Sequence, residues 1–576
     1  MPITGPMTGP IIGRAAGPAA GPAAGEEVIF HNGTVFDGRA FLPAGTCVRV
    51  RGETITAVGP AAEVAPATGA GGTPALAGVS LVDLGGGTLL PGFIDAHVHP
   101  VYAGEQLRRC DLRDGTTAAD YLAIIEGYAT AHPDLEWITG GGWSMDAFPG
   151  GLPTREPLDA VTGGRPAFFP NRDGHGAWVN TAALRLAGID AATPDPADGR
   201  IERDASGEPT GALQEGAANL VSRLLPETTD EDMDAALAAA QDYLLSLGIT
   251  GWQDAIIGSD PGARDNMPAY LRAAGAGRLL VNVVGALWWD RDRGLDQLPD
   301  LLNRRPAGRA GRFRATSVKM MLDGVAETHT AAMLEPYLDA DGCATEHTGL
   351  DFIDPGELPR FVTALDREGF QVHFHALGDR AVRNALDAIE AARAANGNSG
   401  LRHHLAHIQV VHPADIPRFA ALSATANMQA LWATHEPQMD VLTIPFLGER
   451  RAGWQYPFRS LQAAGASLAA GSDWSVSSPN PLWAAHVAVN RSAPDGPGGE
   501  PFLPGQALDL PSFLAAYTSG SARVNGLEDV TGSVRPGLDA DFAVVDADLS
   551  RIPAAEIGRA AVTATWVRGQ VAYQAA

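Results

Sequence analysis

The chain has 576 residues, and 45% of them are hydrophobic, which is enough to bury a large core. Its 67 acidic residues outnumber its 41 basic residues by 26, without a long run of one sign. This balance argues against nucleic acid, anionic membrane surfaces and acidic polymers as partners, and favours a small neutral or cationic substrate. Cys47, Cys110 and Cys343 are too few for a disulfide framework or a zinc ribbon, so we expect a reducing compartment.

Residues 1–25 are rich in Gly, Pro and Ala, a composition typical of a flexible tail. They lack the basic start and the continuous apolar stretch of a secretory signal. No uninterrupted apolar run of about 18 residues, the length of a membrane span, occurs elsewhere in the sequence. We therefore expect a soluble, cytoplasmic protein with no membrane partner.

Residues 26–88 and 533–576 alternate apolar and polar residues around glycine-containing turns, which predicts short antiparallel strands. Neither piece has enough strands to bury a sheet face alone. We expect the two pieces to pair into one small β-sandwich domain built from both ends of the chain.

Eight candidate strands lie between these pieces, and helix-period stretches separate them. The strands cover residues 90–97, 249–254, 279–286, 314–322, 369–376, 401–408, 423–430 and 466–473. This α/β pattern predicts a (β/α)8 TIM barrel over residues 89–106 and 236–532, with its chemistry at the C-terminal ends of the strands. The gap after the first strand is too long for one βα unit, so residues 107–235 are expected to form an insertion that covers the barrel mouth.

Two histidines end the first candidate strand, in the stretch LPGFIDAHVHP at residues 90–100. Alternate residues of a strand share a face, so His97 and His99 are able to hold one metal ion together. A single strand-end histidine is more often a packed core residue than a ligand. Four further candidates follow on other strands: Lys319 on the fourth, His375 on the fifth, His407 on the sixth and Asp473 on the eighth. Because all six fall at the end where a barrel keeps its active site, the set predicts a metal site.

Lys319 is the single lysine of the chain, in the stretch RATSVKMMLDG, whereas arginine fills the other basic positions. Chance or mutational bias explains this composition as well as function does. Arginine does not lose its proton or react with carbon dioxide, but a desolvated lysine does. A lone amine at a strand end is therefore a candidate for chemistry that arginine does not perform.

The sequence resembles the metal-dependent amidohydrolase superfamily and, within it, the amidohydrolase 3 group of YtcJ-like proteins, which includes N-substituted formamide deformylases. The resemblance covers essentially everything after the N-terminal tail. Its motifs are LPGFIDAHVHP, GHGAWVNTAALRLAGI, the lysine followed by DG, HALGDRAV, HIQVVHP, GSDW and GSVRPGLDADFAVVD. The resemblance implies a barrel with a composite β-sandwich and a centre of one or two metal ions.

The resemblance also divides the six candidates between two divalent ions, expected to be zinc: His97, His99 and Asp473 on the first, His375 and His407 on the second, and carbamylated Lys319 as the bridge. Four of the six are neutral imidazoles, so Asp473 and a carbamate supply the negative charge that two dications require. An unmodified lysine cation would repel the metals. His373 lies two residues before His375 but does not directly precede the ALGD of the family pattern, so we interpret it as a packing residue or as one that supports a ligand.

The expected reaction is hydrolysis of a carbon–nitrogen amide bond in a small molecule, such as an N-substituted formamide. A metal-bound water, whose pKa a divalent ion lowers to about 7, attacks a carbonyl that the same centre polarises. Asp473 is the predicted catalytic proton shuttle. His175, in NRDGHGAWVN, is a candidate contact to the developing oxyanion. The alternative, that His175 is a loop histidine bonded to the backbone, is equally expected. Four tryptophans are candidates for an apolar pocket: Trp143, Trp288, Trp432 and Trp474.

Two other functions stay open on the sequence alone. A mononuclear deaminase on the same barrel would use His97, His99, His375 and Asp473 and would need no bridging lysine. A catalytically inactive scaffold protein would be expected to have lost ligands, and none of the six is missing. The expected partner is a small-molecule amide substrate, and a homodimer is compatible with the sequence.

Overall fold

The computed structural model describes residues 27–64, 79–259, 264–494 and 499–576, and the predicted tail at residues 1–25 lies outside them. Its central sheet has eight parallel strands: β7 (Phe93–Val98), β14 (Ile249–Ile257), β15 (Asn282–Trp288), β17 (Phe313–Met321), β18 (Gln371–Ala376), β19 (His404–His407), β20 (Thr425–Met428) and β21 (Ser467–Ala470). Neighbours in the sheet follow the order of the chain. This confirms the predicted (β/α)8 barrel.

The ring of strands closes between its last and first members through the segment that follows β21. The amide of Asp473 donates to the carbonyl of His97 at 2.8 Å, and the amide of His99 donates to the carbonyl of Trp474 at 2.9 Å. Only glycine suits position 471, because a Cβ there would lie 2.5 Å from the backbone nitrogen of His97. Residues from opposite ends of the barrel sequence are therefore held side by side.

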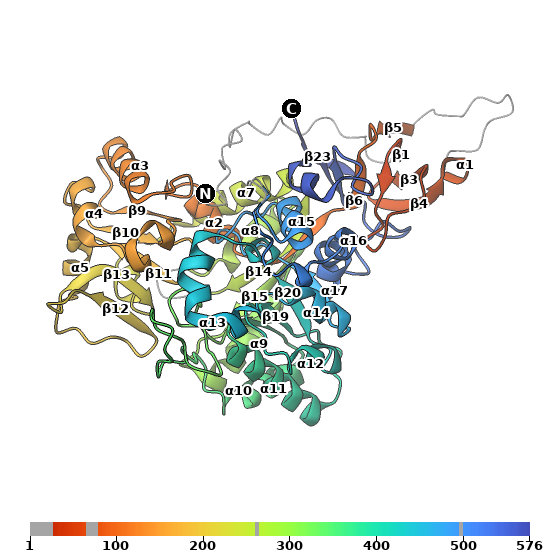
Figure 1. The fold of residues 1–576 in the computed structure, drawn as a ribbon. Coiled ribbons are helices and arrows are strands. Elements are labelled where there is room, and N and C mark those ends of the chain that lie inside the picture. Colours follow the sequence, from red (N-terminus) through yellow and green to blue (C-terminus); the bar gives the residue numbers. More distant parts are fainter. Residues whose placement is uncertain (1–26, 65–78, 260–263, 495–498) are drawn as a thin grey trace.

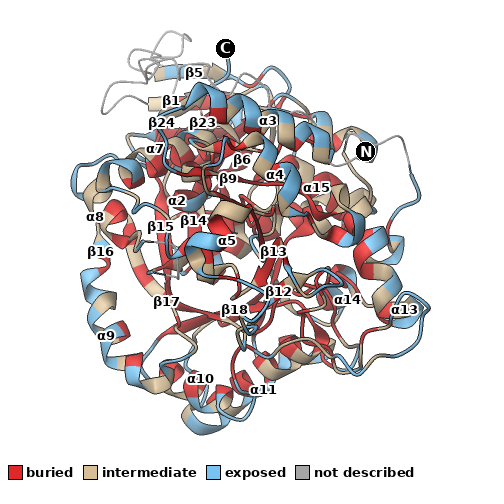
Figure 2. Ribbon diagram, turned by 90° about the vertical axis from the view of Figure 1, so that its left-hand side faces the viewer, coloured by how far each residue is buried: buried red, intermediate tan, exposed pale blue. Residues whose placement is uncertain are grey.

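Helices connect the strands and cover the outside of the ring. They are α7 (Asp230–Ser246), α8 (Met267–Gly275), α9 (Leu298–Ala307), α10 (Leu358–Arg367), α11 (Asp379–Asn396), α12 (Ile416–Ala421), α14 (Phe458–Ala463) and α15 (Pro481–Asn490). In α10, buried Leu358, Phe361 and Leu365 recur three and four residues apart, so one face of the helix is apolar and packs inward. Figure 2 shows buried strands at the centre and helices with exposed outer faces.

The predicted first strand at residues 90–97 is divided between two sheets. β6 (Thr88–Pro91) pairs with β22 (Phe542–Val545) from the C-terminal region, and β7 follows it in the barrel. Gly92 separates the two strands at a point of close packing, where a Cβ would lie 2.0 Å from Oγ1 of Thr250. Both strands are fully buried, so their apolar run is continuous and its periodicity does not reveal the break.

Two smaller sheets form the predicted β-sandwich from both ends of the chain. One contains β1 (Glu27–His31), β3 (Thr46–Arg51), β4 (Thr54–Pro60) and β5 (Val79–Asp83), and the other contains β2 (Thr34–Val35), β6, β22, β23 (Val562–Val567) and β24 (Gln570–Gln574). A shared apolar core joins them, in which the ring of Phe30 meets those of Phe542 and Trp566 edge to face at 5.2 and 5.1 Å. Figure 1 shows the red N-terminal strands beside the blue C-terminal ones.

The long gap after β7 holds α2 (Pro100–Gln106) and then a separate six-stranded sheet. In sheet order, its strands are β12 (Gly199–Arg203), β13 (Pro209–Glu215), β11 (Gly176–Val179), β10 (Ala167–Pro170), β9 (Ile138–Gly141) and β8 (Cys110–Asp111). Helices α3 (Ala118–Ala131), α4 (Arg155–Val161) and α5 (Thr181–Ala187) accompany it. Leu442, from a barrel loop, belongs to the apolar core of this insertion, so the insertion packs against the barrel.

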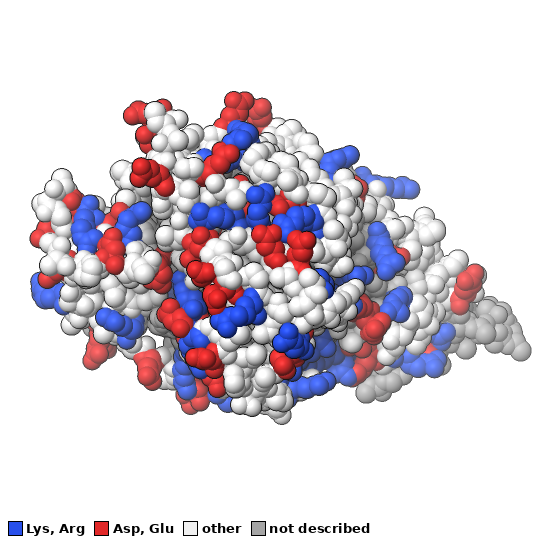
Figure 3. All heavy atoms as spheres, turned by 90° about the horizontal axis from the view of Figure 1, so that it is seen from below, with Lys and Arg blue, Asp and Glu red and all other residues white. Residues whose placement is uncertain are grey.

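Acidic and basic side chains are interspersed on the surface. Figure 3 shows this on the face seen from below. Many of them are paired, such as Arg272 with Asp234 at 2.7 Å. Within the described part of the chain, every helix is too short or too polar to cross a lipid bilayer.

A buried carboxyl in the β-sandwich makes the stability of the protein depend on pH. Asp541 is 2% exposed, and its Oδ1 accepts a hydrogen bond from the amide of Arg568 at 2.8 Å. Burial raises the pKa of Asp541 to about 6, and that amide opposes the rise. The folded state therefore keeps this proton at pH values where the unfolded chain, with a pKa of 3.8, has lost it. The free energy of unfolding therefore falls as the pH rises from 3.8, the pKa in the unfolded chain, to about 6, the pKa in the folded protein.

The variant Asp541→Asn is expected to remove this loss, because an amide keeps the acceptor oxygen and does not ionise. The difference in free energy of unfolding between the variant and the wild type should be about 1 kcal/mol more favourable to the variant at about pH 8 than at about pH 5. Urea denaturation at the two pH values measures it. Asp529→Asn, which removes an exposed carboxylate that faces Arg535, is the control. A gain that does not vary with pH would contradict the prediction.

Candidate metal centre

The six predicted ligands all lie at the C-terminal ends of the barrel strands. β7 contains His97, β17 contains Lys319, β18 contains His375, β19 ends at His407, and His99 and Asp473 lie just beyond β7 and β21. All are buried except His99, whose side chain is 17% exposed. Parallel strands in a closed ring present their C-terminal ends on one face, which is why residues far apart in sequence meet here.

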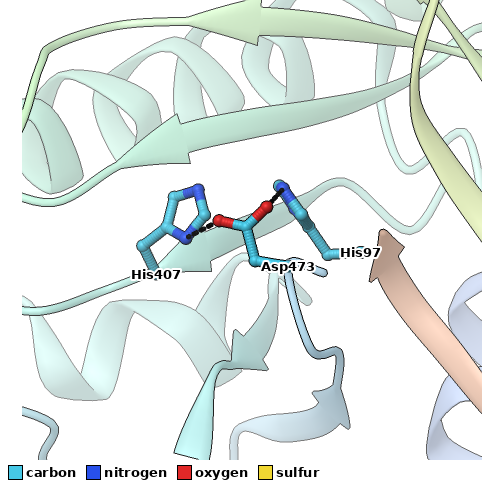
Figure 4. Close-up of side chains that lie close together, drawn as sticks. All are labelled: His97, His407 and Asp473. Atoms are coloured by element: carbon cyan, nitrogen blue, oxygen red, sulfur yellow. Dashed lines mark ion pairs between the residues drawn. The ribbon is translucent and has the colours of Figure 1, made fainter. Parts of the chain in front are cut away.

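His97, His407 and Asp473 form the tightest group. Their candidate ligand atoms lie within 4.8 Å of one another. The carboxylate stands between the two rings, with Oδ1 at 3.3 Å from Nε2 of His97 and Oδ2 at 3.8 Å from Nδ1 of His407 (Figure 4). Two imidazoles and a carboxylate around one point are a donor set suited to a divalent transition metal such as zinc.

His99 and Lys319 extend this group. Nε2 of His99 lies 3.1 Å from Oδ1 of Asp473, and Nζ of Lys319 lies 3.3 Å from Nε2 of His97. Burial lowers the pKa of Lys319 to about 8, although Asp473 and Asp254 oppose the shift. A larger share of this amine is therefore uncharged near neutral pH than for an exposed lysine.

His375 and His175 approach the centre from the other side. The rings of His375 and His407 are 4.5 Å apart, and Nε2 of His375 lies 3.4 Å from the carbonyl oxygen of Gly324. The insertion supplies His175, whose ring is 5.3 Å from that of His375 and whose Nδ1 is 2.9 Å from Oε2 of Glu215. Burial lowers the pKa of His175, but Glu215 outweighs it and raises the value to about 9. His175 is therefore a cation beside the centre.

The protonation states of these residues fit a metal ion. Burial holds the pKa of His97, His375 and His407 well below the usual value, so each ring is neutral and has a lone pair to donate. Burial raises the pKa of Asp473, but contacts with His97 and His99 outweigh it and hold the value well below its usual range. Both ring nitrogens of His407 are buried without a hydrogen-bond partner among the described residues. A divalent cation would satisfy these groups.

Two of the central residues have a strained backbone. His407 has a φ of 76° and Asp473 a φ of 55°, in the left-handed region that non-glycine residues rarely adopt. Such conformations cost roughly 1–3 kcal/mol each and persist where the surroundings enforce them, often at functional sites. The amide of His407 is held by Oε1 of Gln429 at 2.6 Å. The fold therefore maintains costly conformations that aim both side chains at the same point.

Supporting residues around the centre include some that the sequence did not reveal. His373 lies with Nε2 2.7 Å from Nδ1 of His97, so it orients that ring, in line with the supporting role considered for it. Asp95 accepts hydrogen bonds from the amides of His97 at 3.1 Å and Ser472 at 3.0 Å, and so ties β7 to the segment after β21. An acid inside an apolar strand motif is a signal that could have identified Asp95. Glu215, the partner of His175, has no such signal.

A cavity of about 110 Å³ lies between the insertion and the barrel loops. Arg172 and Asp173 line it from the insertion, and Glu327 and Tyr456 line it from the barrel. It borders the centre at Trp432, whose ring stacks on that of His407 at 5.3 Å between centroids. A small molecule in this cavity would contact both the insertion and the barrel loops, and it would lie beside Trp432, next to the candidate metal ligand His407.

Trp432 is the one predicted pocket tryptophan among the residues that line this cavity. Trp143 is buried in the core of the insertion and donates to the carbonyl of Phe169 at 2.8 Å. Trp474 is buried against Tyr243, and Trp288 ends β15. The prediction is wrong for Trp143 and Trp474, because large aromatic side chains fill cores as readily as pockets. Trp288 is half-buried opposite Lys319 in the strand register, and its pocket role stays a prediction.

The sequence and its relatives agree with this geometry. The model of the Amidohydrolase family matches residues 80–573. Protein LONG AFTER FAR-RED 3 of Arabidopsis thaliana is 30% identical over 557 residues, which cover 95% of this chain and 91% of that protein. Putative amidohydrolase YtcJ of Bacillus subtilis is 30% identical over 502 residues, with coverages of 86% and 90%. N-substituted formamide deformylase of Arthrobacter pascens is 29% identical over 546 residues, with coverages of 92% and 94%.

Solved structures share the fold. An uncharacterized metal-dependent hydrolase from Pyrococcus horikoshii superposes with a TM-score of 0.69 at 24% identity, over 92% of this chain and 99% of that one. A second such hydrolase, from Pyrococcus furiosus, gives a TM-score of 0.66 at 25% identity, over 91% and 99%. The family match spans most of the chain, and relatives at 30% identity cover nearly all of it, so the chain belongs to the amidohydrolase family.

Proposed function

We propose that this protein is a metal-dependent hydrolase that cleaves the carbon–nitrogen bond of a small amide, with N-substituted formamides as the first candidates. The observation that carries the proposal is the convergence of His97, His407 and Asp473, from the ends of three different strands, on one buried point beside a cavity. Membership of the amidohydrolase family supports the reaction class. The relative named N-substituted formamide deformylase supports the choice of substrate to try first.

One or two divalent ions, proposed to be zinc, would be held by six side chains: His97, His99 and Asp473 for the first, His375 and His407 for the second, and carbamylated Lys319 between them. Carbamylation would replace a cation with an anion whose nitrogen lies 3.3 Å from Nε2 of His97. Two dications in one site require that change of sign. When bound, such an ion acidifies water and polarises a carbonyl group.

The protein's own groups would move the proton and stabilise charge. Asp473 is ionised, contacts two imidazoles, and would accept a proton from the attacking water and deliver it to the leaving nitrogen. His175, kept cationic by Glu215, would donate a hydrogen bond to the developing oxyanion. The cavity between insertion and barrel would hold the substrate away from bulk water.

The test is a substrate panel on purified, zinc-loaded protein: N-substituted formamides, acyl amides, hydantoins and aminopurines, with amine, formate and ammonia measured separately. We expect near-stoichiometric metal and release of an amine together with its carboxylic acid. A chelator should abolish turnover, and added zinc should restore it. His407→Asn should lose metal and activity, whereas His412→Asn, on the loop that follows β19, should keep both.

Other outcomes would point elsewhere. Ammonia release from aminopurines by protein with one ion per chain would favour the mononuclear deaminase. If metal-loaded protein hydrolysed no compound of the panel, the proposal would be rejected in favour of a catalytically inactive scaffold.

A further inference from the structure

A second cavity lies at the opposite end of the barrel from the metal centre. It is open, measures about 660 Å³ and borders the N-terminal ends of β17, β18 and β19. No Asp or Glu is among its lining residues. Four arginines line it: Arg305, Arg309, Arg314 and Arg402. The chain has 26 more acidic than basic residues, so its composition does not lead us to expect a cavity whose charged lining residues are all positive.

Two of these arginines lie directly opposite each other. The short strand β16 (Arg309–Ala310) pairs antiparallel with β17, and Arg309 is the partner of Arg314 in that register. Like charges at opposite positions of paired strands destabilise the pairing. Burial lowers the pKa of Arg314, and the charge of Arg309 lowers it further. The fold therefore retains an electrostatically unfavourable pair at the rim of the cavity.

No carboxylate of a described residue forms an ion pair with either member of this pair. Arg314 donates to the backbone carbonyls at positions 525 and 526, each at 2.7 Å. Arg309 is exposed, and its guanidinium has no ion pair or hydrogen bond with a described residue. The charge of Glu528 acts on Arg314, but Glu528 is already paired with Arg402.

Arg305 adds a third guanidinium that has no carboxylate partner in the part of the chain that the structure describes. It projects from α9, donates to the carbonyl of Glu368 at 2.8 Å and lies over the ring of Phe370 at 4.3 Å. These contacts hold the side chain in place but leave its charge uncompensated. The cavity therefore presents three positive groups on a fixed frame of strand and helix.

We propose that this cavity binds a small molecule that carries phosphate groups, with Arg305, Arg309 and Arg314 as the ligands of the phosphate oxygens. The planar fork of a guanidinium matches two oxygens of one phosphate, and such charge-assisted bonds are the strong ones. A bound dianion would also offset the repulsion between Arg309 and Arg314. The site is independent of the hydrolytic centre, which lies at the other end of the strands.

The walls of the cavity indicate what else the ligand carries. Apolar residues stand beside the arginines: Leu302, Pro306, Leu401 and Val524. Small-molecule sites typically measure roughly 300–1,000 Å³. A ligand with an apolar or flat portion next to its phosphates, as in a nucleoside diphosphate, uses both kinds of surface.

Isothermal titration calorimetry of the full-length, metal-loaded protein at low salt, with ADP and with pyrophosphate, tests the proposal. We expect one ADP per chain, tighter binding of ADP than of pyrophosphate because of the apolar walls, and weaker binding of both as salt is raised. Arg309→Ala should weaken both affinities about tenfold, since it removes one charge-assisted contact. Arg309→Lys, which keeps the charge but loses the fork, should weaken them less.

Two controls separate this site from others. Arg39→Ala removes an exposed guanidinium that has no partner among the described residues of the β-sandwich, and it should leave the affinities unchanged. Phosphates also bind divalent metals, so the titration is repeated with Asp473→Asn, in which binding should persist. The proposal is overturned if neither compound binds, if Arg309→Ala binds as the wild type does, or if Asp473→Asn alone loses binding. If pyrophosphate bound as tightly as ADP, the inference that the ligand carries an apolar or flat portion against the cavity walls would be overturned.

Discussion

Replacing Asp473 with asparagine is expected to lower kcat for amide hydrolysis by about 10²–10⁴-fold. The carboxylate lies 3.3 Å from Nε2 of His97 and 3.1 Å from Nε2 of His99, so it is positioned both to hold a metal and to carry a proton. Asparagine has nearly the same shape but does not accept a proton or supply a negative charge. Steady-state kinetics on the best substrate of the panel measure the loss.

The metal content of the same samples tells how Asp473 acts. A variant that keeps its metal but loses kcat has lost the proton shuttle, and a variant that loses both has lost a ligand. Asp529→Asn, at a side chain that is 95% exposed, removes the same charge from the surface and should change neither quantity. Asparagine at position 473 with a wild-type kcat would contradict the assigned role.

Replacing Lys319 with alanine is expected to have the second large effect. Turnover should fall at least about a hundredfold, and the metal content should also be lower. Lys319 is 3% exposed, and its Nζ lies 3.3 Å from Nε2 of His97, at the position of the proposed bridge. Without the carbamate, one negative charge and two oxygen donors are missing from a site that must hold dications. Kinetics and metal analysis on the same preparation measure both losses.

Arginine at position 319 is the matched comparison, because it keeps the positive charge and the length but does not form a carbamate. We expect Lys319→Arg to be as inactive as Lys319→Ala. Added acetate should restore part of the activity of the alanine variant, since a small carboxylate fits the space left by the side chain and supplies the missing oxygens. Full activity in either variant would reject a bridged centre.

The barrel was predictable because its signals are local. Each strand is a short apolar run, and each has a chemically distinctive residue near its C-terminal end, as Lys319 and His407 show. Parallel strands in a closed ring bring those ends to one face, so the convergence of the six side chains follows from strand type and order. The break at Gly92 was not predictable, because it depends on contact with Thr250, which is 158 positions further along the chain.

The sequence by itself determined the fold class, the family and the set of residues that meet at the barrel mouth, because these depend on periodicity and on residue types at strand ends. Only the tertiary structure decided which groups touch: His373 behind His97, Glu215 beside His175, Trp432 rather than three other tryptophans at the cavity, and Arg309 opposite Arg314. Those contacts depend on ring closure, strand register and loop packing. The first three join elements that are far apart along the chain, whereas Arg309 and Arg314 are close in sequence and face each other only through the register of β16 with β17.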